Sequence, residues 1–301
     1  MARGDHQNDD DDFMDPRQRN RATGRRKEGD EKKKRIRNRA SQERLTALTD
    51  KFNNDQKGAS TAKMGMQSMM AVWCTNLVNP VCDWLAEIYE PTSREFVIPG
   101  RGRLLLNEDS VFCTLGVPRG HIKVPYEVNN EIEQELFPRL FPASESMPNT
   151  SVVADLLQAM MTHGDVFKMK LLMYLISAVF APTTSLRPSN KCFPILANLK
   201  NVKNMNWCKF IADFLHDAFK NKMYQKGCRL HLMLMYVDCL DLSTVDFSVV
   251  GGLPPTHKFA VSAWTINAIK AVLAAHRATD TTYGKLQVSF CLSLPTACLQ
   301  I

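Results

Sequence analysis

The sequence lacks most of the signatures from which a function is usually inferred. Its longest apolar run, from Leu171 to Pro182, is about 12 residues, shorter than the roughly 18 that a membrane-spanning helix needs. Charged and polar residues follow Met1, where a secretory signal would have an apolar core. We therefore expect no membrane insertion and an intracellular location.

Motifs for catalysis and cofactor binding are also missing. The sequence has no G-x-x-x-x-G-K-[ST] loop for phosphates, no G-x-G-x-x-G turn and no C-x-x-C pair. Its nine cysteines stand singly, in an odd number and without regular spacing, which argues against a disulfide framework. We expect them to be free, buried thiols.

The remaining reactive side chains do not form a convincing site. Cys228 and His231 are the best pair for a metal, but structural zinc requires four ligands, usually from close pairs. Asp238 and Asp241 are expected to hydrogen-bond neighbouring backbone or loop groups. We predict no catalytic residue, no cofactor and no bound metal.

What the sequence does have is an uneven distribution of charge. Of the net charge of +7, residues 17–39 contribute an excess of nine, from twelve Lys and Arg against three acids. The remaining residues are therefore slightly acidic. Most of these cations form two clusters and their flank: Arg25, Arg26, Lys27, Lys32, Lys33, Lys34, Arg35, Arg37 and Arg39.

Paired basic clusters of this kind fit the acidic grooves of nuclear import receptors. They also neutralise phosphates, so non-specific contact with nucleic acid through the same arm is compatible with import. A solubilising tail remains an alternative. The clusters favour a nuclear location, with an import receptor as one partner and other protein partners unknown.

Composition divides the chain into three parts. Residues 1–60 are acidic and then basic, with few large apolar residues, so we expect a disordered arm. Residues 61–278 carry apolar patterning typical of a helical domain, and residues 279–301 form a poorly defined tail. The predicted fold class is mainly α, a single helical domain with a small β-hairpin near 96–106, preceded by the disordered basic arm.

Within the domain, the clearest amphipathic helix is predicted from Asn206 to about Met223, and an almost wholly apolar helix from about 165 to 180. Asn107 is expected to cap a helix from Glu108 to Leu115 that ends at Gly116. Further helices are predicted over 64–77, 81–89, 228–240 and 258–275, with shorter ones near 41–52, 129–136 and 151–162.

Six segments resemble, in order and spacing, the plant mobile domain family, also labelled aminotransferase-like. They are residues 91–102, 107–120, 181–185, 206–215, 227–228 and 236–241. The resemblance covers about residues 65–275. It implies a helical domain of transposon ancestry that is usually nuclear. In some relatives it is linked to silencing of mobile elements.

Other members of that family carry a C-terminal cysteine peptidase domain of the SUMO-protease type. The peptidase's catalytic His, Asp, Gln and Cys have no match after Leu240. The resemblance and the missing motifs together predict a non-enzymatic nuclear interaction protein. A truncated SUMO-protease-type peptidase that lacks its catalytic domain, and a degenerate gene fragment, remain alternatives.

Overall fold

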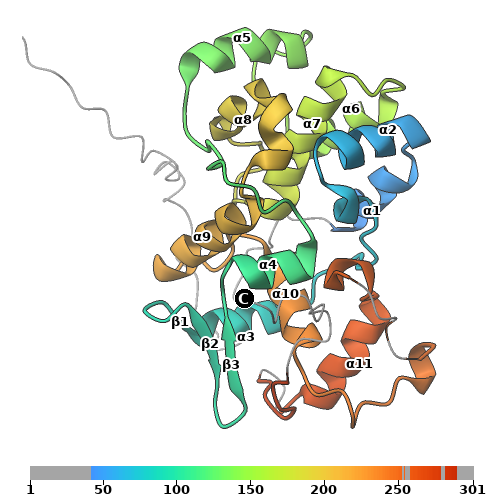
Figure 1. The fold of residues 1–301 in the computed structure, drawn as a ribbon, viewed down its shortest axis with the longest axis vertical. Helices are drawn as coiled ribbons and strands as arrows, with labels where there is room; N and C mark the ends of the chain where they lie inside the picture. The colour runs from blue at the N-terminus through green and yellow to red at the C-terminus, as the bar shows by residue number, and fades with distance from the viewer. Residues whose placement is uncertain (1–41, 253, 255–257, 279–281, 290–301) are drawn as a thin grey trace, which may run out of the picture. The chain divides into compact units, whose positions relative to one another are not determined.

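The structure, a computed structural model, describes residues 42–252, 254, 258–278 and 282–289. These residues are mainly helical, which confirms the predicted fold class (Figure 1). The predicted disordered arm, apart from its last residues, lies outside the described part, as do all nine cations of its basic clusters.

The α-helices follow one another along most of the described chain: α1 (Gln42–Asp50), α2 (Asn54–Gly58), α3 (Asn79–Glu87), α4 (Glu108–Leu115), α5 (Asn130–Leu140), α6 (Thr150–Ala159), α7 (Asp165–Leu175), α8 (Phe193–Ala197), α9 (Trp207–Lys220), α10 (Arg229–Asp238) and α11 (Ile266–His276). Shorter π- and 3-10 turns connect them: η2 (Ala59–Lys63), η3 (Gln67–Met70), η4 (Ile176–Phe180), η5 (Asn190–Cys192), η6 (Leu199–Asn204), η7 (Ser248–Val250) and η8 (Ala260–Ser262).

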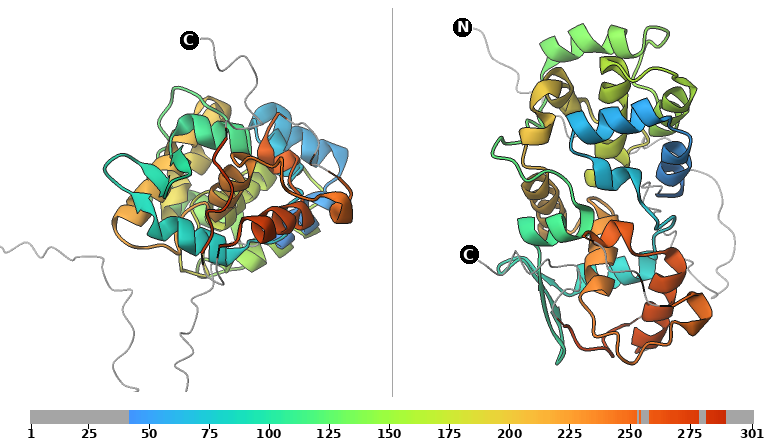
Figure 2. Two further views of the ribbon diagram at one scale, coloured as in Figure 1. Left: turned by 90° about the horizontal axis from the view of Figure 1, so that it is seen from below. Right: turned by 45° about the vertical axis from the view of Figure 1, so that its right-hand side comes forward.

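Two buried helices organise the core. Nearly all of α7 and its continuation η4 is buried, as the uninterrupted apolar run predicted, and α7 packs against α5, α6 and α8 (Figure 1). Every residue of α10 is buried as well, between α3, α4 and α11 (Figure 2). Because both helices bury side chains on all faces, they carry a large share of the hydrophobic stabilisation.

The predicted hairpin is present, with one strand more than expected. β2 (Glu95–Ile98) pairs antiparallel with β3 (Gly102–Leu105), and Phe96 faces Leu104 across the pair. β1 (Tyr89–Glu90) adds to β2 through Tyr89, which faces Phe96. The predicted helix over 81–89 therefore ends early, because Tyr89 is taken up by the sheet and its ring packs on Phe96.

The cap signals around α4 are confirmed. The Asn107 side chain accepts a hydrogen bond from the backbone N–H of Ser110 at 2.9 Å, and the helix ends at Gly116 in the left-handed conformation. A Cβ at Gly116 would lie 2.4 Å from the Phe259 ring. This glycine is therefore needed both for its backbone angle and for the close approach of Phe259.

Two helix predictions were wrong. Residues 64–77 form only the short 3-10 turn η3, because Gly65 adopts a φ of +70° and interrupts a helix. The apolar side chains there, such as Met66 and Met69, are buried from turns and loops instead. The last helix, α11, begins at Ile266 rather than near 258, where the Thr265 side chain caps it by accepting from Ala268 N.

The described residues near both ends pack on the domain. In α1, Leu45 and Leu48 belong to the core, and the following Phe52 meets the ring of Phe167 at 5.2 Å. Folded residues are therefore present well before position 61. After α11, Val288 forms an antiparallel bridge with Leu240.

The predicted thiols are only partly confirmed. Six cysteines are buried and in no disulfide: Cys74, Cys82, Cys113, Cys192, Cys208 and Cys228. Cys239 is disulfide-bonded, so the prediction fails at that position. Among the described helices, none has the length and apolarity required to cross a membrane.

Candidate functional site: a groove beside α9

Two segments far apart in the sequence meet at the start of α9. The chain after α4 lies against the chain before α9, with Gly120 N donating to Met205 O at 3.2 Å and Ile122 N donating to Asn204 O at 3.0 Å. In return, Asn206 N donates to Ile122 O at 2.7 Å. We call this contact between residues 118–122 and 204–207 the junction.

The junction requires a glycine. A Cβ at Gly120 would lie 1.9 Å from the carbonyl oxygen of Asn204, far inside any real contact. Since the obstructing atom belongs to the backbone, no side-chain rotation could relieve the clash. Gly120 therefore allows the two backbones to approach closely enough to exchange hydrogen bonds.

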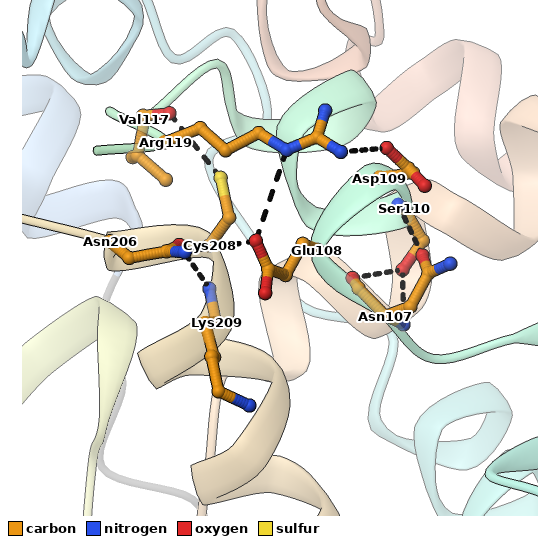
Figure 3. A network of polar contacts seen from close by, with 9 residues as sticks. All are labelled: Asn107, Glu108, Asp109, Ser110, Val117, Arg119, Asn206, Cys208 and Lys209. Carbon is orange, nitrogen blue, oxygen red and sulfur yellow. Dashed lines mark hydrogen bonds and ion pairs between the residues drawn. The ribbon is translucent and has the colours of Figure 1, made fainter. Parts of the chain in front are cut away.

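Polar side chains lock the junction to α4 (Figure 3). Arg119 lies between Glu108, at 3.9 Å from its Nε, and Asp109, to which its Nη2 donates. Asn206 Nδ2 donates to Glu108 Oε2 at 2.9 Å, and Asn206 Oδ1 caps α9 by accepting from Lys209 N. Both acids sit in the first turn of α4, where a negative charge is favourable. The network therefore fixes the start of α9 against the start of α4.

A groove opens beside this network, between the chain that leaves the junction and the outer face of α9. Its volume is about 480 Å³, within the range of ligand and peptide pockets. We call it the α9 groove. It is lined by His121, Lys123, Val124, Tyr126, Asn206, Lys209, Phe210, Asp213, Phe214 and Asp217.

Three aromatic rings form the apolar part of the α9 groove. Tyr126 contacts Phe210 at 5.3 Å and Phe214 at 6.0 Å between ring centroids, and the two phenylalanines are 6.1 Å apart. All three side chains are half-buried. The rings are tilted or edge-on to one another, so they form a packed apolar cluster with part of its surface open to the groove.

The charges of the groove are unevenly balanced. Asp213 accepts from Lys209 Nζ at 2.9 Å and from Arg94 Nη2 at 2.7 Å. Partial burial acts to raise its pKa, but the hydrogen bonds from Lys209 and Arg94 outweigh burial and lower it. Two cations are thus paired with the one carboxylate of Asp213. Lys123 is exposed, and Asp217 is exposed further along α9.

His216, also on α9, belongs to the fold rather than to a catalytic pair. Its Nδ1 lies 2.7 Å from the Tyr89 hydroxyl. Burial raises the pKa of Tyr89 to about 12, so the hydroxyl keeps its proton at neutral pH in this hydrogen bond. Partial burial, followed by the nearby Arg94, lowers the pKa of His216.

The reactive side chains of α10 are buried in the core. Thr114 Oγ1 donates to Ser110 O at 2.7 Å, so it accepts from His231 Nδ1, which lies 2.5 Å away. Burial lowers the pKa of His231 to about 3. Arg229 is 1% exposed and bonds Asp83 at 2.7 Å as well as backbone carbonyls. His231 is therefore neutral, and both side chains serve the fold.

The predicted pairs do not combine into a site. Cys228 and His231 do not act together, because the imidazole is committed to Thr114. Asp238 accepts from Trp264 Nε1 at 2.8 Å, and Asp241 accepts from Ser243 N at 3.0 Å, as expected of structural carboxylates. Within the described residues, no group of three or more His, Cys, Asp or Glu could hold a metal.

Burial also makes the described thiols poor nucleophiles. It raises the pKa of Cys74 to about 11, and that of Cys192, Cys208 and Cys228 to about 12. The thiolate is the reactive form of cysteine, so these side chains are held in the unreactive one.

Sequence reasoning did not identify the α9 groove. No element was predicted between Gly116 and the helix near 129–136, and Phe210 and Phe214 have the apolar spacing that, in the amphipathic helix from Asn206, indicates a core-facing side. A detectable signal was present, since 110–126 and 166–212 contain no Asp or Glu. The predicted contact residues of the basic arm, Arg25 to Arg39, lie outside the described residues.

Comparison with known proteins gives one match. A family model described as "Domain of unknown function (DUF8566)" matches residues 38–250. The matched range includes the junction and every residue of the α9 groove. No curated protein and no solved structure matches the chain.

Proposed function

The chain belongs to the DUF8566 family, and from that premise we propose that it is a non-enzymatic nuclear protein that acts by binding other proteins through the α9 groove. The groove carries the proposal: three half-buried rings lie open to solvent beside charged side chains, on a wall fixed by the junction. Apolar anchors ringed by charge are the usual composition of a protein interface.

The structural contacts of the reactive side chains support a binding role. His231 and Asp238 are used to satisfy Thr114 and Trp264 inside the core, and burial raises the pKa of Cys208 and Cys228, which holds these thiols in their protonated form. Each of these groups has a structural use that accounts for its presence. A binding function requires none of them to react.

The nuclear location rests on the basic arm. Arg25 to Lys27 and Lys32 to Arg37 provide two clusters of the kind that import receptors bind, and the same cations can contact nucleic acid without sequence preference. Ancestry in the plant mobile domain family, with a link to silencing of mobile elements, is part of the same proposal. The six ordered segments that resemble that family support it.

Purification from nuclei tests the binding role. Tagged wild-type chain is recovered from nuclear extract with and without nuclease, beside Phe210→Ala, which removes one ring of the groove, and Val249→Ala, which trims a side chain that is 82% exposed elsewhere. We expect nuclease-resistant partners with wild type and Val249→Ala and their loss with Phe210→Ala. An unchanged set with folded Phe210→Ala, checked by thermal melting, contradicts the proposal.

A reporter tests the arm separately. Residues 1–60 fused to a fluorescent protein too large to diffuse through nuclear pores should accumulate in the nucleus, and changing Lys32, Lys33, Lys34 and Arg35 to Ala should reduce that accumulation. An even distribution of the unaltered fusion would contradict import by the arm.

A further inference from the structure

Resting on the proposed function, we propose that the α9 groove takes an acidic peptide segment with an apolar anchor side chain. The peptide's carboxylates would face the end of the groove formed by Lys123 and Lys209, and its anchor would pack on Tyr126, Phe210 and Phe214. The inference combines the charge around the junction with the geometry of the three rings.

The junction brings together the two acid-free stretches of the chain. Residues 110–126 and 166–212 contain no Asp or Glu, and the junction joins them by backbone hydrogen bonds at 118–122 and 204–207. Lys123 and Lys209, one from each stretch, line the groove, and Lys200 and Lys203 lie on η6, which comes directly before residues 204–207 in the sequence.

The lysines of η6 add positive charge next to the junction. In a 3-10 helix, side chains three residues apart lie nearly in line, so Lys200 and Lys203, both exposed, extend from the same face of η6. Arg119 does not add to the free charge, because Glu108 and Asp109 both pair with it. Lys209 is paired with Asp213 in the same way, so Lys123 is the exposed lysine of the groove lining that is in no ion pair with another described residue. Its long stem lets the ammonium group follow a bound carboxylate.

The far end of the groove has the opposite character. Asp217 is exposed there, and Asp213 lies between the two ends, held by Arg94 and Lys209. The electrostatic potential along the groove is therefore positive near Lys123 and negative near Asp217. An acidic segment is attracted to the first end and repelled at the second, which gives the bound peptide one preferred direction.

The aromatic cluster favours a peptide over single-stranded nucleic acid. Bases bind by stacking on free ring faces. Here the planes of Tyr126 and Phe214 are 81° apart, and those of Tyr126 and Phe210 are 58° apart, with the rings in contact. Ring faces turned toward neighbouring rings leave edges and small apolar gaps, which a Phe, Leu or Met side chain can fill.

A selection from a displayed library of random short peptides provides the test, with purified full-length chain as bait. We expect the enriched sequences to carry net negative charge beside an aromatic or aliphatic residue. The best peptide is then labelled, and its binding is measured by fluorescence anisotropy against a version with Asn and Gln in place of Asp and Glu. We expect the amide version to bind at least about tenfold more weakly and salt to weaken the acidic version.

Matched variants locate the site. Lys123→Glu reverses a charge in the groove at a side chain that is exposed, and it should weaken the acidic peptide about tenfold or more. Lys270→Glu makes the same change on α11, outside the groove, and should leave binding as it was. Both variants should melt like the wild type, which shows that the fold is intact.

Three results would overturn the inference: enrichment of neutral or basic peptides or of none, equal binding of the amide version, or an unchanged affinity in Lys123→Glu. Displacement of the labelled peptide by unlabelled oligothymidine at a lower concentration than by unlabelled peptide would assign the site to nucleic acid instead. If nuclear partners depend on Phe210 while acidic peptides fail, the proposed function stands and only this inference falls.

Discussion

Helices α9 and α10 carry similar polar residues in opposite surroundings. Each has a histidine and a cation paired with an aspartate, yet in α10 the histidine and the cation are buried in the core, whereas in α9 they lie at the surface beside a groove. Burial in the core changes the acidity of the α10 histidine, because it lowers the pKa of His231 to about 3. The same residue types thus stabilise the fold in one helix and are open to a partner in the other.

The largest effect should come from the buried cation of α10. Arg229→Met removes the ion pair with Asp83 and leaves the carbonyls of Asn79 and Tyr224 without their donor. Removing one partner of a buried pair costs about 3–5 kcal/mol. Because the Asp83 side chain is 41% exposed and can be hydrated, we expect about 3 kcal/mol by urea denaturation. Lys270→Met, at an exposed site, should change the free energy of unfolding little. An equal loss of stability in Arg229→Met and Lys270→Met would contradict a stabilising role of the buried Arg229.

The pH dependence of folding should report the buried histidine. The pKa of His231 falls from 6.5 to about 3 on folding. At pH values between these two pKa values, His231 is therefore protonated in the unfolded state and neutral in the folded state. The free energy of unfolding should therefore decline as pH falls below 6.5, by about 1.4 kcal/mol per pH unit from this residue. His276, whose pKa burial lowers to about 4, adds a decline of the same sign.

Denaturation curves at several pH values check this prediction through slopes rather than absolute stability. His231→Gln should flatten the decline, whereas His163→Gln, at an exposed position before α7, should not. A wild-type stability that stays constant between pH 6.5 and 4 would contradict a neutral, buried His231.

A smaller effect is expected from the partner of His231. Thr114→Val keeps the shape of the side chain but leaves His231 Nδ1 without its acceptor in the core. An unpaired buried donor costs about 1–3 kcal/mol. Thr92→Val, at an exposed turn, serves as the control. Equal denaturation midpoints for the two variants would mean that the hydrogen bond to His231 contributes nothing.

The smallest effect should come from the matching contact on α9. Tyr89→Phe removes the hydroxyl that is hydrogen-bonded to His216 Nδ1 at 2.7 Å. His216 is only half-buried, so water can replace the hydroxyl and the loss should be about 0.5–1 kcal/mol. The comparison between the helices predicts that this loss is less than that of Thr114→Val under the same conditions. The reverse order would contradict it.

Local signals predicted much of the fold. The boundaries of α4 followed from Asn107 and Gly116, because a cap and a left-handed glycine act within one turn. The buried α7 followed from its unbroken apolar run. Residues 64–77 misled the same reasoning, because their apolar side chains fill gaps between elements and Gly65 prevents a helix that would place them on one face.

The α9 groove could not be predicted in this way, because its walls are joined through non-local contacts: the backbone hydrogen bonds of the junction and the packing of Tyr126 on Phe210 and Phe214. The family-like segments illustrate the difference. Residues 107–120 meet 206–208 at the junction, and Gly227 N donates to Pro182 O at 3.0 Å. Segments that look like separate motifs in the sequence therefore contact each other in the fold. Which segment contacts which is seen only in the structure.

The junction also brings together the two ends of the segment formed by residues 123–203. They leave beside Ile122 and return beside Met205, two residues paired in a parallel bridge, and between them lie α5, α6, α7 and α8 (Figure 1). A segment whose ends are side by side can vary in length or be exchanged with little strain on its base. Changes in α5 and its flanking loops should therefore leave the start of α9 in place, because Gly120 and Asn206 hold it at the junction.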